Sequence, residues 1–72
     1  MKYITILIPT YNEAEVLPKL FARLHTLAES NKRVSFEFLF INDGSDDDTL
    51  AIIKQAAGRN HRISYINLSR NF

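Results

Sequence analysis

The chain has 72 residues, which is enough for one domain and too few for two. Hydrophobic residues make up 46% of it and charged residues 24%, which is typical of a chain with a packed core and excludes a disordered segment. The absence of cysteine excludes a disulfide framework, and a net charge of +1 gives no electrostatic footprint for nucleic acid, so no nucleic-acid partner is expected.

The first predicted element is a strand over residues 3–8, which reads Tyr-Ile-Thr-Ile-Leu-Ile and stops at Pro9. Both of its faces are apolar, which favours a central strand of a parallel sheet. The apolar run is too short for a signal peptide core with a cleavage site and far too short to span a bilayer. We therefore expect a cytoplasmic domain.

An amphipathic helix is predicted next, because apolar residues recur at three- and four-residue steps up to about Ser30. The position of its first residue has two interpretations. Asn12 could cap the helix, with Glu15 three residues on, which would leave Pro18 inside it. Alternatively, the regular helix begins near Leu17 with Pro18 in its first turn.

The remaining predicted elements are a strand over residues 34–42, a helix over residues 49–57 and a strand over residues 63–68. Ser45 followed by Asp48 indicates the start of the second helix, with carboxylates in its first turn, where the helix dipole favours negative charge. Gly58 is predicted to end this helix as a left-handed cap after Ala57.

Strands that alternate with helices predict an α/β fold, βαβαβ, with three parallel strands in the order 3-2-1 and right-handed crossovers. Both crossovers then run in one direction, so both helices cover the same face of the sheet. The other face stays bare, although neither face of the first strand, with Ile4, Ile6 and Ile8 on one side and Tyr3, Thr5 and Leu7 on the other, is polar enough for water. We therefore interpret residues 1–72 as the N-terminal part of a single, truncated domain, and we expect a missing part or a second copy to cover that face.

Ligands of open parallel sheets bind beyond the carboxyl ends of the strands. These ends are residues 9–13, 42–47 and 69–72. Tyr11, Asn12 and Glu13 offer a ring, an amide and a carboxylate, which suit stacking on a base and hydrogen bonding to a ribose hydroxyl. Asp43 could accept the imide proton of uracil, and Gly44 lets the backbone come close.

The first strand is followed by neither the glycine-rich turn of a dinucleotide site nor a phosphate-binding loop. A metal held by carboxylates is the common substitute for such a loop. The run Asp46-Asp47-Asp48 satisfies the pattern Asp-x-Asp, but it opens a helix, where capping and dipole effects account for acidic residues. We therefore expect no metal ligand in this chain.

Three segments resemble the opening motifs of the family two glycosyltransferases, which have the GT-A (Rossmann-like) fold. They are Ile8-Pro9-Thr10-Tyr11-Asn12-Glu13, residues 42–49 (Asn-Asp-Gly-Ser-Asp-Asp-Asp-Thr) and residues 68–72 (Leu-Ser-Arg-Asn-Phe). The last segment is most similar to the branch that transfers a sugar to a polyprenyl phosphate, the dolichol-phosphate mannosyltransferase and bactoprenol glucosyltransferase type. The resemblance implies an inverting enzyme with a UDP-type sugar donor and a parent protein attached to the cytoplasmic membrane.

Position by position, the resemblance implies that Pro9 and Tyr11 border the nucleobase, that Glu13 meets the ribose and that Asp43 accepts a hydrogen bond from the base. Arg70 lies in the segment that, in relatives, lines the phosphate and acceptor region. A purely structural role would also explain each of these residues, such as ending a strand for Pro9 or forming a turn for Asp43.

Asp47 and Thr49 match the family's pattern at a helix start, which implies a structural role. The metal-binding Asp-x-Asp and the catalytic residues of the family follow a fourth strand. A divalent cation, Mg or Mn, is therefore expected in the full-length enzyme, whereas this chain is expected to bind none and to be inactive alone.

Two other interpretations remain open. One is a flavodoxin-like nucleotide-binding or regulatory module without turnover, although a response regulator would need an acidic pair after the first strand, where residues 9–13 offer one acid. The other is a fragment that exists only as an oligomerising or crystallisable piece, with self-association through the uncovered sheet face.

Overall fold

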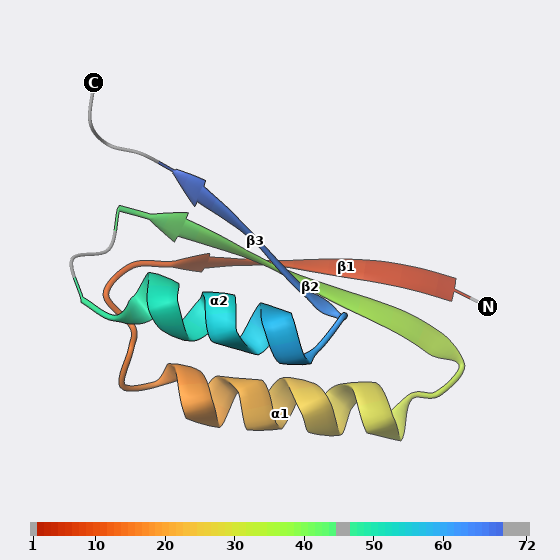
Figure 1. The fold of residues 1–72 in the computed structure, drawn as a ribbon. Helices are drawn as coiled ribbons and strands as arrows, with labels where there is room; N and C mark the ends of the chain where they lie inside the picture. The colour runs from red at the N-terminus through yellow and green to blue at the C-terminus, as the bar shows by residue number, and fades with distance from the viewer. Residues whose placement is uncertain (1, 45–46, 69–72) are drawn as a thin grey trace.

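The computed structural model describes residues 2–44 and 47–68. Its elements are β1 (Lys2–Thr10), α1 (Leu17–Ser30), β2 (Val34–Asp43), α2 (Thr49–Arg59) and β3 (Ile63–Leu68). Within the described residues the strands form one parallel sheet in the order β1-β2-β3, which is the predicted order read from the other edge (Figure 1). The predicted α/β fold is confirmed.

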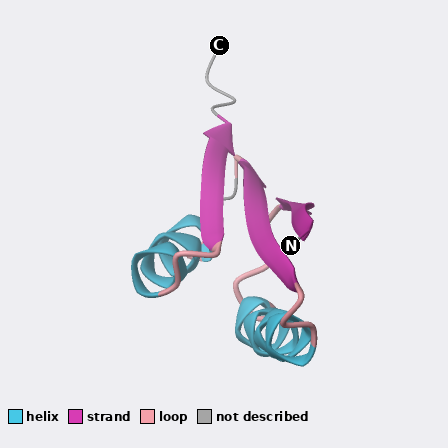
Figure 2. Cartoon of the chain, turned by 90° about the vertical axis from the view of Figure 1, so that its right-hand side faces the viewer, coloured by secondary structure: helices cyan, strands magenta, loops and turns pink. Residues whose placement is uncertain are grey.

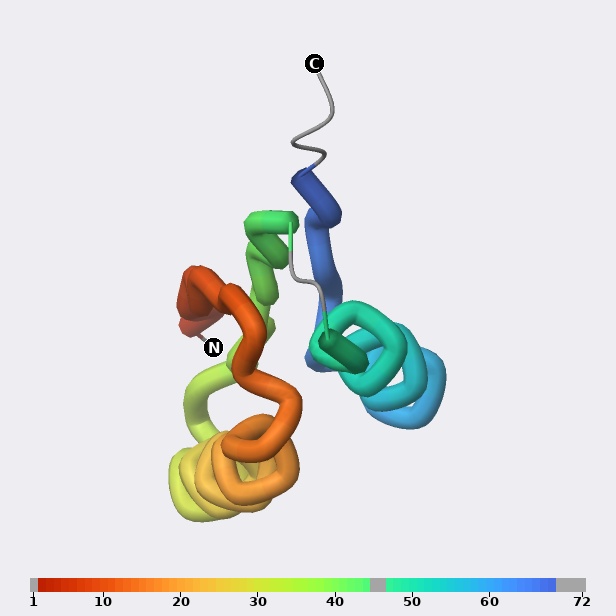
Figure 3. Tube along the Cα trace, turned by 90° about the vertical axis from the view of Figure 1, so that its left-hand side faces the viewer, coloured from red at the N-terminus to blue at the C-terminus, as the bar shows by residue number. Residues whose placement is uncertain are grey.

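Both helices lie on the same face of the sheet, as two views of the chain from opposite ends show (Figures 2 and 3). The core between the helices and the sheet consists of Leu17, Ala28, Phe36, Phe38, Phe40, Ile53 and Ile63. Alternation along β2 directs its three phenylalanines to the helix side. The Phe21 ring of α1 meets the Phe40 ring edge-on, with centroids 5.5 Å apart, so aromatic packing joins helix and sheet.

The start of α1 follows the second of the two interpretations, because the helix begins at Leu17 with Pro18 in its first turn. Proline removes no helical hydrogen bond there, since the first N–H groups of a helix have no intrahelical acceptor. Asn12 is not the cap. The N-cap residue is Val16, and the Glu13 carbonyl accepts hydrogen bonds from the N–H groups of Val16 and Leu17 at 3.1 and 3.2 Å.

The prediction for Gly58 was wrong, since α2 continues through it to Arg59. The left-handed glycine in the described residues is Gly44, with a φ of 67°. The turn after α2 is instead made by Asn60, whose N–H donates to the Ala56 carbonyl at 2.9 Å and whose side-chain oxygen accepts the Arg62 N–H at 3.0 Å. Because Asn60 closes the turn, the helix has no need of a left-handed cap at residue 58.

The start of α2 also differs from its prediction. The helix begins at Thr49 with Asp48 as its N-cap residue, so Asp47 and Asp48 precede the first turn instead of standing in it. Ser45 lies outside the described residues. The carboxylate that accepts a backbone N–H of the first turn belongs to Asp47.

The face opposite the helices carries exposed apolar side chains from β1 and β3. Tyr3 is 81% and Leu7 60% exposed, and Ile66 and Leu68 are each 46% exposed. Near the centre of this bare face the Glu37 carboxylate accepts long hydrogen bonds of 3.4 Å from two hydroxyls, those of Thr5 and Ser64. Neither described helix covers this face, as expected for two right-handed crossovers that run in the same direction. None of the helices in the described part of the chain is long and apolar enough to cross a membrane.

The substitution Gly58→Ala distinguishes the two accounts of the end of α2. A Cβ at this position would have no atom within 4 Å, and alanine restricts the unfolded chain more than glycine does. The free energy of unfolding, measured by urea denaturation, should therefore rise by about 0.4–1 kcal/mol.

The matched control is Gly44→Ala, which places a Cβ at a φ of 67° and should lower the free energy of unfolding by about 1–2 kcal/mol. A loss of stability in Gly58→Ala of the size seen in Gly44→Ala would contradict the helical assignment of residue 58.

Candidate functional site

The candidate site lies at the carboxyl edge of the sheet, where the loops after β1 and β2 meet because these strands are neighbours. Thr10 and Asn42, paired across the two strands, are each only 2% exposed. The Thr10 hydroxyl donates to the Ile41 carbonyl at 3.2 Å, and the Asn42 amide donates to the Asn67 side-chain oxygen at 2.9 Å. These polar side chains tie the three strand ends together below the loops.

Three hydrogen bonds join the loop after β1 to the start of α2. The Glu13 N–H donates to the Thr49 hydroxyl oxygen at 2.8 Å, and the Ala14 N–H donates to Asp47 Oδ2 at 3.3 Å. In the opposite direction, the Asp47 N–H donates to Asn12 Oδ1 at 3.4 Å. We call these five residues the loop clamp, because side chains from each loop satisfy backbone groups of the other.

Asp47 is the charged member of the loop clamp. Its Oδ1 accepts hydrogen bonds from the Thr49 hydroxyl and from the Thr49 N–H, the latter at 2.9 Å. The Thr49 hydroxyl is the main reason that the pKa of this carboxyl lies below its ordinary value of 3.8, with backbone N–H donors, including that of Ala14, acting in the same direction. Thr49 itself is fully buried, and its hydroxyl is satisfied both as donor and as acceptor.

The loop after β1 turns at Asn12, which has a φ of 49° in the left-handed region. Asparagine tolerates this conformation better than most side chains. The sequence pattern identified Asn12 only as a possible cap or ligand contact, so its backbone role was missed. The signal that could have indicated it is an asparagine between a strand end and a helix start.

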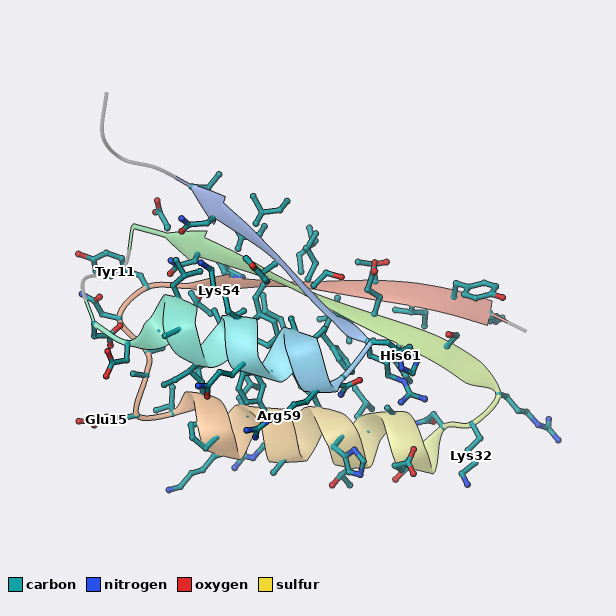
Figure 4. All side chains as sticks on the ribbon, in the orientation of Figure 1. Tyr11, Glu15, Lys32, Lys54, Arg59 and His61 are labelled. Atoms are coloured by element: carbon teal, nitrogen blue, oxygen red, sulfur yellow. The ribbon has the colours of Figure 1, made fainter. Side chains whose placement is uncertain are left out.

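The predicted site residues on the described part of the chain gather at this edge. Tyr11 is 48% exposed and lies toward the opposite end of the molecule from Lys32 (Figure 4). Glu13 and Asp43 are half-buried, and Pro9 is exposed. Arg70 lies outside the described residues, and the binding roles assigned to all five residues stay predictions.

Pro9 and Asp43 are on the bare-face side of the sheet. The register pairs Pro9 with Ile41, and alternation places Asp43, two residues further along β2, on the same face. In β3, Leu68 is the partner of Asp43 and shares that face. A base that contacts both Pro9 and Asp43 would therefore approach from the side of the sheet away from the helices.

A divalent cation needs a cluster of oxygen ligands. In residues 2–44 and 47–68 no group of three His, Asp or Glu side chains is placed to hold a metal ion. The two Asp47 oxygens are engaged by the N–H and hydroxyl donors of the loop clamp. The described residues therefore do not fit the cation that the resemblance implies, and we assign no step to a metal here.

Residues 5–72 match the family model described as glycosyl transferase family 2. The Bacillus subtilis protein named "Putative glycosyltransferase CsbB" is 43% identical over 76 residues, covering 96% of this chain and 21% of the relative. The uncharacterized glycosyltransferase sll0501 of Synechocystis is 42% identical over 69 residues, with the same two coverages. YkcC, an uncharacterized glycosyltransferase of Bacillus subtilis, is 35% identical over 94% of this chain and 21% of its own length. The chain thus spans about a fifth of the length of these curated relatives.

The lowered pKa of Asp47 predicts an acid-dependent part of the stability. Its ionised form stabilises the fold fully above the ordinary value of 3.8, and this contribution is lost as the pH falls through the lower folded-state pKa. Between about pH 5 and about pH 2, the wild-type chain should therefore lose more of its free energy of unfolding than Asp47→Asn does.

The control is Asp48→Asn, which removes a neighbouring charge at the same helix start and leaves the loop clamp in place. Denaturation curves across this pH range should show the smaller acid loss in Asp47→Asn. Parallel pH profiles for Asp47→Asn and the wild type would refute the role of this carboxylate.

Proposed function

The chain belongs to glycosyl transferase family 2, and we propose that residues 1–72 are the nucleotide-sugar-binding portion of a glycosyltransferase. The observation that carries the proposal is the loop clamp. It holds Glu13 against the start of α2, at the edge where open parallel sheets bind ligands. Family membership also removes the reason to prefer a flavodoxin-like regulatory module.

The proposed base is uracil. The Asp43 carboxylate, half-buried at the end of β2, would accept the imide N–H, while the exposed Tyr11 ring would stack on the base and Pro9 would border it. Gly44, with a φ of 67°, brings the backbone past the base without a side chain. Cytosine presents an acceptor in place of the imide N–H, so a carboxylate at this position favours a UDP-type donor.

The proposed ribose contact is Glu13, whose carboxylate can accept hydrogen bonds from sugar hydroxyls. Beside it lies an open hollow of about 520 Å³, lined by Asn12, Glu13, Glu15, Val16 and Asp47, of which three are acidic residues. This negative lining disfavours a diphosphate in the hollow. We therefore assign the phosphates to Arg70 and to a divalent cation, Mg or Mn, bound by other parts of the full-length enzyme.

The acceptor we propose is a polyprenyl phosphate, with a parent protein attached to the cytoplasmic membrane. The support for both is the resemblance of residues 68–72 to the polyprenyl-phosphate branch. Self-association through the bare face is a further proposal, supported by the exposed Tyr3 and Leu7. A symmetric pairing centred on Glu37 would bring two carboxylates together, so such a dimer would have to be offset.

Titration of UDP and CDP into the full-length protein tests the base contacts. Asp43→Ala should weaken UDP binding roughly tenfold or more, because a hydrogen bond to a charged group contributes about 1.5–3 kcal/mol and about 1.4 kcal/mol is a factor of ten. The wild type should prefer UDP to CDP, and Asp43→Ala should lose most of this preference.

Tyr11→Ala should also weaken UDP binding, since stacking of a base on an aromatic side chain contributes about 1–3 kcal/mol. Tyr11→Phe keeps the ring and is expected to bind UDP like the wild type. Wild-type affinity in both Asp43→Ala and Tyr11→Ala would rule out this base site.

A further inference from the structure

The loop clamp joins the loop that carries Glu13 to Asp47 and to the start of α2. Glu13, the ribose contact, donates its own N–H to Thr49, while Asp43, the base contact, ends β2 four residues before Asp47. The bonded residues are 33 to 36 positions apart in the sequence. The clamp therefore fixes the loop after β1 relative to Asp47 and the start of α2, which local helix capping would not do.

We propose that Asn12, Asp47 and Thr49 are positioning residues of the nucleotide site. They set the place of Glu13 relative to Asp43 and thereby the selectivity of the site for the ribose hydroxyls. This inference rests on the proposed function. None of the three residues has to touch the nucleotide. Each acts through a hydrogen bond to the other loop.

Of the three positioning residues, Thr49 is expected to affect the place of Glu13 most, because its side chain is buried. Its side chain is fully buried, and its hydroxyl oxygen lies 2.8 Å from the Glu13 nitrogen. Without the hydroxyl, the half-buried Glu13 N–H would lose its acceptor, and a shift of the backbone toward water would restore one. Such a shift moves the Glu13 carboxylate, and hydrogen bonds weaken steeply with misalignment.

Asn12 contributes in two separable ways. Its left-handed backbone, with a φ of 49°, reverses the chain between Tyr11 and Glu13, and its side-chain oxygen accepts the Asp47 N–H at 3.4 Å. Glycine would keep the backbone conformation and remove the acceptor, whereas aspartate would keep an acceptor and tolerate the same φ. The pair Asn12→Gly and Asn12→Asp therefore separates the side-chain contact from the backbone conformation.

The experiment compares Thr49→Val, which replaces the hydroxyl with a methyl group of similar shape, with Thr49→Ser, which keeps the hydroxyl. Affinities for UDP, 2′-deoxy-UDP and 3′-deoxy-UDP are measured calorimetrically on the full-length protein, at a temperature where circular dichroism shows every variant folded. We expect the wild type to bind at least one deoxy analogue several-fold more weakly than UDP. Thr49→Val should weaken UDP binding by roughly five- to tenfold and bring the ratio of the UDP affinity to the deoxy-analogue affinity close to one. Thr49→Ser should keep the wild-type ratio.

If Thr49→Val is poorly folded, the exposed Asn12 provides the same comparison. Asn12→Gly should bring the ratio of the UDP affinity to the deoxy-analogue affinity closer to one, and Asn12→Asp should retain the wild-type ratio. A Thr49→Val or Asn12→Gly protein that is less stable but keeps the wild-type ratio would overturn the positioning role, since a purely structural contact leaves the ratio unchanged. Failure of the wild type to bind UDP would overturn the proposed function and this inference with it.

Discussion

The hydrogen bond between the Glu13 N–H and the buried Thr49 hydroxyl satisfies two polar groups that would otherwise be costly to remove from water. It can form because β1 and β2 are parallel neighbours, so that their loops leave the sheet at the same edge. Asp47 completes the arrangement, since its carboxylate accepts the Thr49 hydroxyl and the Ala14 N–H. The hydrogen bonds of Asp47 thus give this carboxylate a structural role in joining the two loops.

The two faces of the sheet that meet this edge differ in packing, since one is covered by helices and the other is exposed. The helix side is filled by phenylalanines of β2, with Phe38 and Phe40 almost fully buried, and this packing fixes the sheet on which the loops stand. The opposite side exposes Tyr3 and Leu7 and carries the Glu37 carboxylate between two hydroxyls. Because Pro9 and Asp43 share that opposite side, a nucleotide held by them would border an open apolar surface.

Features of the fold that depend on residue pattern and chirality could be predicted from the sequence. Alternating strand and helix patterns, together with right-handed crossovers, predicted the strand order and the single covered face. Gly58 was misassigned because helix ends depend on which neighbour closes the turn, and Asn60 does so here. The loop clamp was beyond prediction, since Asp47 and Thr49 read locally as a helix start, and their contacts with residues 12–14 exist only once β1 and β2 are paired. Arg70 was predicted by resemblance and lies outside the described residues.

The proposed uridine site lies between Tyr11 and Asp43, in the loops after β1 and β2. Nuclear Overhauser contacts between the uracil H5 and H6 protons and the side chains of the UDP-bound full-length protein test it most directly. We expect contacts from the uracil protons to the Tyr11 ring protons and to Pro9. Uracil contacts confined to the opposite end of the sheet, near Lys2 or Lys32, would contradict it.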